Sequence, residues 1–237
     1  MHDDRVVPDL TVSDNVKTHG VAIGHRVQVA LLVGVCLGLA YLAINSITSR
    51  LPYDVNAMTA WDRAIPFIPE WVWVYNLNIP MPLALILFIK QGDELMEVVA
   101  GYLVIFVVAG SLFLALPVHA DELRAVIAHQ PQTLSVALVD FYYNFDGIGN
   151  CLPSLHVAYS VYAGWWGLKL MPRWLGLPYA LLGLAITVST MTIKQHFIAD
   201  VVSAILIVGI VYWLQRKRGL RLRDSMPKAL VGFVTKT

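Results

Sequence analysis

The stretch VVAGYLVIFVVAGSLFLALP, residues 98–117, contains no charged side chain. About 20 apolar residues in a helix suffice to cross a hydrocarbon core of roughly 30 Å. Five similar runs flank this one, two before it and three after it. Together the six runs cover residues 27–47, 71–89, 98–117, 155–171, 174–193 and 197–215. The sequence therefore predicts an all-α polytopic membrane protein with six transmembrane helices.

Composition agrees with this prediction and excludes several classes of function. Of 237 residues, 57% are hydrophobic and only 14% are charged, a balance that soluble domains rarely show. Lys and Arg number 17 and Asp and Glu 16, so no net positive field attracts a polyanion. We therefore expect the lipid bilayer, and no nucleic acid, as a partner.

Two of the runs carry internal signals. The second contains Asn76, Asn78, Pro80 and Pro82, and a helix there should kink because proline removes a backbone donor. The fourth and fifth runs are separated only by Pro172-Arg173, which predicts a tight helical hairpin. The first run is too long for the apolar core of a secretory signal and is expected to remain as a span.

Basic residues are unevenly distributed over this topology. With six spans both termini share one side, which receives thirteen of the seventeen Lys and Arg residues. The other side keeps Arg50, Arg63, Arg124 and Lys194. Cytoplasmic loops are enriched in Lys and Arg, so we expect both termini in the cytoplasm and the protein in a cell (inner) membrane. The outer-loop charges Asp54, Asp62, Arg63 and Glu70 are expected to be solvated.

Three parts follow from these boundaries. Residues 1–26 form a cytoplasmic N-terminal segment, residues 27–215 a six-helix membrane domain and residues 216–237 a basic cytoplasmic tail. Within the long outer connection 118–153, the stretch SVALVDFYYNF predicts an amphipathic helix on the membrane surface.

Three ionisable residues open membrane spans at one depth, and such residues are functional candidates because burying them is costly. His196 and Asp200 open the sixth span, and residues four apart lie on one helix face. The carboxylate can fix one imidazole nitrogen and leave the other free as a base or nucleophile. His156 opens the fourth span, where it can protonate a leaving oxygen.

The surroundings of His156 favour an anion. It lies in NCLPSLHVAYS, residues 150–160, where Asn150 is a candidate cap and Pro153 suits a first helical turn. Free N–H groups at a helix start bind anions, and Ser154 adds a hydroxyl. Together the residues describe a phosphoester site that needs no metal and no cofactor. Three other interpretations remain open: a proton-coupled transporter, a metal site of two His and one carboxylate, and a structural subunit.

The two histidine segments also resemble a known family. NCLPSLHVAYS, followed about forty residues later by STMTIKQHFIAD, resembles the paired motifs of the type 2 phosphatidic acid phosphatase superfamily. The PSLH form and the upstream stretch YDVNAMTAWDRAIPFIPEWVWVY resemble the branch that includes fungal inositol phosphorylceramide synthase. The resemblance covers roughly residues 50–212.

This resemblance implies roles for individual residues. His196 would be the nucleophile that forms a phosphohistidine, Asp200 would orient it, and His156 would protonate the leaving group. Ser154 and nearby amides would hold the phosphoryl oxygens, and Ser189 matches the serine that opens the last motif.

The sequence departs from the broad superfamily in its basic residues. Thr190 stands where an Arg usually follows the serine, and Lys194 is a candidate replacement. No Lys-x6-Arg-Pro motif precedes Leu116-Pro117. Arg124 is the substitute we predict, with His119 as a second choice.

The resemblance implies a membrane lipid phosphate or phosphodiester as substrate. We expect a lipid phosphatase whose active site lies at the outer membrane face. The alternative is a head-group phosphotransferase of the inositol phosphorylceramide synthase type, in which Asn144, Asp146 and Asn150 are candidates for binding a polyol acceptor.

Overall fold

The computed structural model describes residues 20–236 except 52–54, 56, 147–148 and 218–220. The described residues are 77% helical and contain no strand, which confirms the all-α class. The longer helices are α1 (Ile23–Thr48), α4 (Pro80–Phe88), α5 (Gly92–Ala115), α7 (Leu134–Phe145), α8 (Leu155–Leu170), α9 (Arg173–Thr192) and α10 (Ile198–Arg216). The shorter ones are α2 (Ala60–Ala64), η1 (Pro69–Trp71), α3 (Val72–Tyr75), η2 (Asn76–Asn78), α6 (Asp121–Arg124), η3 (Ala125–His129), η4 (Leu222–Ser225) and α11 (Lys228–Val234).

Five helical segments of the described chain are long and apolar enough to cross a membrane. They are Ile23–Thr48, Pro69–Phe88, Gly92–Ala115, Arg173–Thr192 and Ile198–Arg216. The remaining predicted run forms α8, whose 16 residues extend only about 24 Å at 1.5 Å per residue. Length and apolar character thus identify five of the six predicted spans.

The segment Pro69–Phe88 bends where its asparagines and prolines predict a kink. It consists of η1, α3, η2 and α4 in succession rather than one continuous helix. The amide of Asn78 donates to the main-chain oxygen of Tyr75 at 2.6 Å, so a side chain replaces a backbone donor at the break. The break separates α4 from α3, which carries Tyr75 and contacts α7 and α9.

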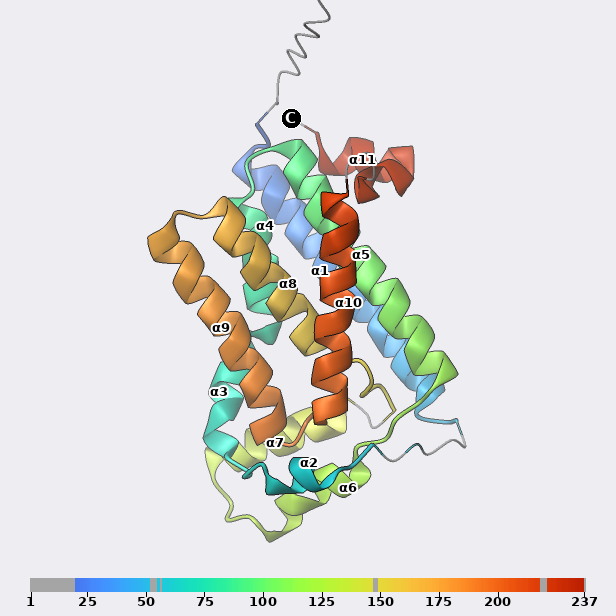
Figure 1. Ribbon diagram of the computed structural model, residues 1–237, viewed down its shortest axis with the longest axis vertical. Coiled ribbons are helices and arrows are strands. Elements are labelled where there is room, and N and C mark those ends of the chain that lie inside the picture. Colours follow the sequence, from blue (N-terminus) through green and yellow to red (C-terminus); the bar gives the residue numbers. More distant parts are fainter. Residues whose placement is uncertain (1–19, 52–54, 56, 147–148, 218–220, 237) are drawn as a thin grey trace, which may run out of the picture.

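Helix α8 occupies the centre of the bundle, where it packs against α4, α5, α9 and α10 (Figure 1). Small residues allow these close contacts. A methyl group on Gly101 of α5 would overlap the hydroxyl of Tyr162, and one on Gly183 of α9 would overlap the main-chain oxygen of Ser160. The predicted tight hairpin between α8 and α9 is present, and its turn consists of Met171-Pro172.

The outer faces of the bundle are apolar. Leu31 and Leu39 of α1 and Leu206 of α10 are each more than 60% exposed, as expected of side chains that contact lipid. Trp61 and Trp174 are both 76% exposed. They belong to α2 and to the first turn of α9, which lie near opposite ends of the bundle (Figure 1), and tryptophan is enriched at both membrane interfaces. These features are those of a membrane protein.

The first and last described helices meet at one end of the bundle. His25 Nε2 of α1 lies 2.7 Å from the main-chain oxygen of Phe233 in α11. Helix α11 also contacts α5, so the segment that we predicted only as a basic tail includes a packed helix. The opposite end carries α2, α6 and α7 (Figure 1).

Helix α7 contains the predicted amphipathic stretch. It buries Val136, Val139 and Tyr143 against the bundle, while Leu134 and Phe141 are 72% and 56% exposed. Its outward face carries these apolar side chains together with the exposed polar residues Asp140 and Asn144, a mixture that suits a helix at the membrane interface.

Candidate active site

Two histidines from distant parts of the sequence meet where α8 and α10 begin. His156 Nδ1 lies 3.1 Å from His196 Nε2. Both helices start at the end of the bundle that carries α2, α6 and α7 (Figure 1). The prediction that His156, His196 and Asp200 share one end is therefore confirmed.

Asp200 orients the His196 ring. Its Oδ2 lies 3.0 Å from His196 Nδ1 and accepts the main-chain N–H of Phe197 at 2.9 Å. The side chains of His196 and Asp200 are only 4% and 0% exposed. Since a carboxylate accepts hydrogen bonds, Nδ1 carries the proton, and Nε2 is the nitrogen that faces His156.

The loop between α9 and α10 holds His196 through main-chain bonds. The N–H groups of Gln195 and His196 both donate to the main-chain oxygen of Thr190, at 2.9 and 3.1 Å. Lys194 adopts a φ of 58°, a left-handed conformation that non-glycine residues seldom take. This residue turns the chain sharply between the two helices.

Asp62 anchors the same loop, although we predicted a solvated charge. It is 2% exposed, and its Oδ1 accepts the N–H of Ile198 at 2.7 Å. Its Oδ2 accepts the N–H of Thr59 at 2.8 Å in the capping box of α2. The start of a helix leaves N–H groups without partners, and Asp62 satisfies such groups on two helices. Asp54, in the same prediction, lies outside the described residues.

Lys194 points to this anchor. Its Nζ donates to the main-chain oxygen of Asp62 at 2.6 Å. Burial lowers the pKa of Lys194 from its ordinary value because the ammonium loses hydration, and the Asp62 carboxylate opposes this shift. The lysine thus ties the outer segment to the His196 loop.

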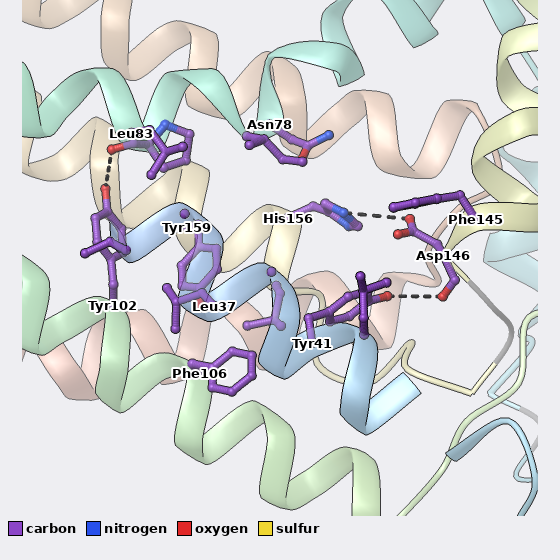
Figure 2. Close-up of a pocket in the computed structure, with 17 residues that line it drawn as sticks. Leu37, Tyr41, Asn78, Leu83, Tyr102, Phe106, Phe145, Asp146, His156 and Tyr159 are labelled. Atoms are coloured by element: carbon purple, nitrogen blue, oxygen red, sulfur yellow. Dashed lines mark hydrogen bonds and ion pairs between the residues drawn. The ribbon is translucent and has the colours of Figure 1, made fainter. Parts of the chain in front are cut away.

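His156 contacts a second carboxylate through a tyrosine. Tyr75 Oη lies 3.2 Å from His156 Nε2 and donates to Asp146 Oδ2 at 3.0 Å. His156 Nε2 and Asp146 Oδ2 are 3.8 Å apart, and Figure 2 shows the two side chains facing each other. Gln195 also donates to Asp146 Oδ2. We did not predict Tyr75 or Gln195, and we considered Asp146 only for an acceptor.

A small cavity lies between these groups. Its volume of about 10 Å³ has room for about one water molecule. Four predicted site residues meet around it, and the full lining is Tyr41, Arg124, Asp146, Asn150, Cys151, His156, Gln195 and His196.

Two of the predicted phosphate-binding residues line this cavity. Arg124 is 7% exposed, and it donates to the main-chain oxygen of Tyr143 at 3.0 Å. Asn150 accepts the hydroxyl of Thr48 at 2.6 Å. The buried amide nitrogen of Asn150 has no partner among the described residues, so it is available to a ligand oxygen.

The other three predicted phosphate-binding residues do not line the cavity. Ser154, rather than Asn150, caps α8, because its hydroxyl accepts the N–H of Val157 at 3.2 Å. Pro153 accordingly precedes the cap instead of lying in the first turn. The hydroxyl of Ser189 donates to the main-chain oxygen of Ile186 at 2.6 Å, and Lys194 binds Asp62 as described above. His119 and Asn144 do not line the cavity either.

One group of potential metal ligands includes His196. Ligand atoms of Cys151, His196 and Asp200 lie within 4.8 Å of one another. Burial, and then the Asp200 carboxylate, raise the pKa of the Cys151 thiol, which favours the neutral thiol over the thiolate that metals bind. The Asp200 carboxylate already accepts the hydrogen bond of the protonated His196 Nδ1, so neither atom is available as a metal ligand. This donor set fits a metal poorly.

An apolar groove leads away from His156. It has a volume of about 240 Å³ and is lined by α1, η2, α4, α5 and α8. His156 and Asp146 lie at one end, and Leu83 and Tyr102 lie at the other (Figure 2). The small cavity and the groove meet at His156 and Asp146, so together they can accommodate a molecule with a charged head group and an apolar tail.

Comparison with known proteins gives one result. A family model described as the PAP2 superfamily matches residues 43–214. This range contains all residues that line the small cavity and the apolar groove, except those of α1 that precede position 43. Neither the curated proteins nor the solved structures gave a match. Members of the superfamily are phosphatases, so the match supports an enzyme of the phosphatase type that acts on lipid phosphoesters. It does not distinguish the inositol phosphorylceramide synthase branch.

Proposed function

The chain belongs to the PAP2 superfamily, and on that premise we propose that it is an integral membrane lipid phosphatase that works through a phosphohistidine on His196. One observation carries the proposal. Asp200 engages His196 Nδ1 at 3.0 Å, and the free nitrogen, Nε2, lies 3.1 Å from His156. An oriented nucleophile and an acid next to it are the two groups that phosphoester cleavage needs.

In the first step His196 Nε2 attacks phosphorus. The N–P bond forms, the bond from phosphorus to the lipid oxygen breaks, and His156 gives its Nδ1 proton to that oxygen. Asp200 stabilises the positive charge that develops on His196. The products of this step are the lipid alcohol and phosphohistidine.

In the second step water attacks the phosphohistidine. His156, now deprotonated, accepts a proton from the water, the O–P bond forms and the N–P bond breaks. Inorganic phosphate leaves, and both histidines return to their starting states. The same residue serves as acid and then as base, as microscopic reversibility requires.

The cavity must widen before this chemistry begins. An attacking atom lies about 3–3.5 Å from the atom it attacks, and the His156–His196 gap of 3.1 Å leaves no room for a phosphoryl group between the rings. We therefore expect the His156 ring to move aside when the substrate binds. This movement exposes His196 Nε2 and breaks the bond between the two rings.

Phosphate oxygens would be held by Arg124 and Asn150. Both line the cavity beside the histidines, and both offer N–H donors. Arginine matches the geometry of phosphate oxygens well. Ser154, Ser189 and Lys194 would act indirectly, because their bonds hold the starts of α8 and α10 in place.

The lipid tail would lie in the apolar groove. The groove joins the cavity at His156 and is bordered by α1, the least buried of the five candidate spans in the described chain. A lipid could enter sideways from the bilayer between α1 and α4 with its phosphate directed to His196. This path supports a lipid rather than a soluble phosphoester as substrate.

We also propose that α8 is the sixth span. Helix α1, the Pro69–Phe88 segment and helices α5, α8, α9 and α10 traverse the bundle alternately (Figure 1). Since α1 begins and α11 ends on the same side of the bundle, the number of traverses is even, and α8 completes it. The bias of basic residues then supports cytoplasmic termini, a cell membrane and an outward-facing site.

An alcohol could replace water as acceptor, which would make the protein a head-group phosphotransferase. One observation favours this second candidate. Asn150 Nδ2 and Gln195 Oε1 are buried, have no partner among the described residues and belong to residues that line the cavity. A polyol hydroxyl could bond to both.

Product analysis distinguishes the two functions. Purified protein in lipid nanodiscs is incubated with phosphatidic acid and other lipid phosphates, without any ion gradient, while inositol or glycerol is increased. We expect free phosphate and lipid alcohol, and none of either with His196→Ala. Saturable formation of a new phosphodiester with negligible free phosphate would establish the transferase instead.

A further inference from the structure

We propose that Tyr75 and Asp146 are positioning residues that keep the proton of His156 directed at the leaving group. The inference rests on the proposed function, since it concerns the acid of that reaction. It gives each histidine its own carboxylate: Asp200 contacts His196 directly, and Asp146 reaches His156 through the Tyr75 hydroxyl.

The bonds around Tyr75 define where its one hydrogen lies. Tyr75 Oη donates to Asp146 Oδ2 at 3.0 Å, so it can only accept from His156 Nε2, which lies 3.2 Å away. His156 Nε2 must then carry a hydrogen. Tyr75 is fully buried and Asp146 is 6% exposed, so bulk water has little access to these two side chains.

The same reasoning extends to the second ring. His196 Nδ1 carries a hydrogen because it faces Asp200. His156 Nδ1 and His196 Nε2 face each other at 3.1 Å, and two lone pairs at that distance would repel, so one hydrogen lies between them. Two rings then carry three hydrogens, so one of them is an imidazolium in this arrangement; burial disfavours such a charge on His156, and the Asp146 carboxylate offsets part of that cost.

Placing the shared hydrogen on His156 gives the state that the reaction requires. His156 is then a charged donor, and His196 is neutral with a free lone pair on Nε2. When the substrate separates the rings, the hydrogen passes to the leaving oxygen. Tyr75 favours this arrangement because its oxygen accepts the second N–H of His156, and the Asp146 carboxylate, 3.8 Å away, stabilises the positive charge.

Of the other groups around His156, some stabilise a positive charge on its ring and others oppose it. From α1, Tyr41 donates to the main-chain oxygen of Asp146 at 3.2 Å. Arg124 of α6, which opposes a positive charge, and Cys151, a neutral thiol, line the same cavity. His196 faces His156 from the loop before α10, with Asp200 behind it. Asp146 is the carboxylate closest to His156, at 3.8 Å.

The test compares two leaving groups in the purified full-length protein. Tyr75→Phe removes the hydroxyl and keeps the ring, and Asp146→Asn removes the charge. With a lipid phosphate, whose alkoxide needs protonation, we expect kcat to fall about 10²-fold in each variant, within the usual range for acid assistance. With a nitrophenyl phosphate ester, whose leaving group needs little protonation, the rate of the first, bond-breaking step, measured as pre-steady-state release of nitrophenolate, should fall less than about threefold.

A double-mutant cycle and a matched control make the result specific. If Tyr75 acts through His156, adding Tyr75→Phe to His156→Ala should cause no further loss. Tyr162→Phe removes another buried hydroxyl from the bundle, at Gln215, and should leave the ratio of the two activities unchanged. Retained nitrophenyl activity shows that each variant is folded.

Each outcome decides a separate point. A loss with the alkoxide alone supports the inference. Equal losses with both substrates, or additive losses in the double variant, overturn it and leave the proposed function intact. Absence of hydrolysis of either substrate by the wild type overturns the proposed function and this inference together.

Discussion

His156 and His196 are forty positions apart in the sequence, yet their facing ring nitrogens lie 3.1 Å apart. The contact exists because two helices, α8 and α10, begin at the same end of the bundle beside each other. It brings a candidate acid and a candidate nucleophile together, and it closes the site until a ligand separates the rings.

The two histidines should respond differently to the leaving group. His196→Ala should abolish turnover of every substrate, because no nucleophile remains. His156→Ala should lose about 10²–10⁴-fold with a lipid phosphate and much less in the first, bond-breaking step with a nitrophenyl ester. Pre-steady-state release of nitrophenolate measures that step. An equal loss in both substrates would remove His156 as the acid.

Filling the apolar groove should affect lipids selectively. Gly38 lines the groove, and a Cβ there meets no atom within 4 Å, so Gly38→Phe should be tolerated by the fold. We expect KM for a long-chain lipid phosphate to rise at least about tenfold, a loss of roughly 1.4 kcal/mol of binding. A short, soluble phosphoester should be unaffected.

Gly209→Phe is the matched control for this variant. Gly209 is also a helical glycine with open space around it, but it lies on α10 and does not line the groove. If both substitutions raise KM equally, the effect comes from the membrane surface and not from the groove.

Removing the Asp62 anchor should weaken the His196 loop. Asp62→Ala leaves the N–H of Ile198 and the cap of α2 without their acceptor. An unsatisfied buried donor costs about 1–3 kcal/mol, so thermal unfolding should occur at lower temperature and kcat should fall. Asp140→Asn, at an exposed acid of α7, is the control. Unchanged stability of Asp62→Ala would show that Asp62 is dispensable.

Orientation can be tested at two exposed positions. Leu134, 72% exposed, is the first residue of α7, which lies at the end of the bundle where α8 and α10 begin, and Trp174, 76% exposed, is in the first turn of α9, which begins at the other end. In a Cys36→Ser background, a membrane-impermeant thiol reagent applied to intact cells should label Leu134→Cys and not Trp174→Cys. The reverse pattern would place the site on the cytoplasmic face.

Chelators should leave the activity unchanged. The Cys151, His196 and Asp200 donors require a thiolate and a free imidazole nitrogen, and burial keeps the thiol protonated. Activity should be the same before and after dialysis against a chelator. A loss that zinc or another divalent ion restores would replace the phosphohistidine mechanism with a metal site.

Most of the fold could be predicted because the bilayer imposes one strong rule. A membrane span needs a long apolar run, and the run at 98–117 therefore led directly to α5. The asparagines and prolines before position 83 predicted the break in the Pro69–Phe88 segment for an equally local reason. Helix α8 is the exception, since its 16 residues are surrounded by other helices.

The site could be predicted only in part. His156, His196 and Asp200 were found because ionisable residues at span ends are rare. Asp62 was misjudged, because the sequence does not reveal that an outer segment folds back onto the start of α10. Tyr75 and Gln195 are not ionisable residues at a span end, so the sequence did not mark them as candidates. Each belongs to the site because it donates a hydrogen bond to Asp146, which is distant in the sequence, and only the packed structure shows that contact.

Direct detection of phosphohistidine tests the central claim most closely. His156→Ala should accumulate it with a nitrophenyl phosphate monoester, because the first step needs little acid and the second lacks its base. After quenching in alkali, peptide mass spectrometry should find an acid-labile phosphoryl group on His196, and none when His196→Ala is added. A phosphoryl group on another residue, or continued turnover by His196→Ala, would contradict the account.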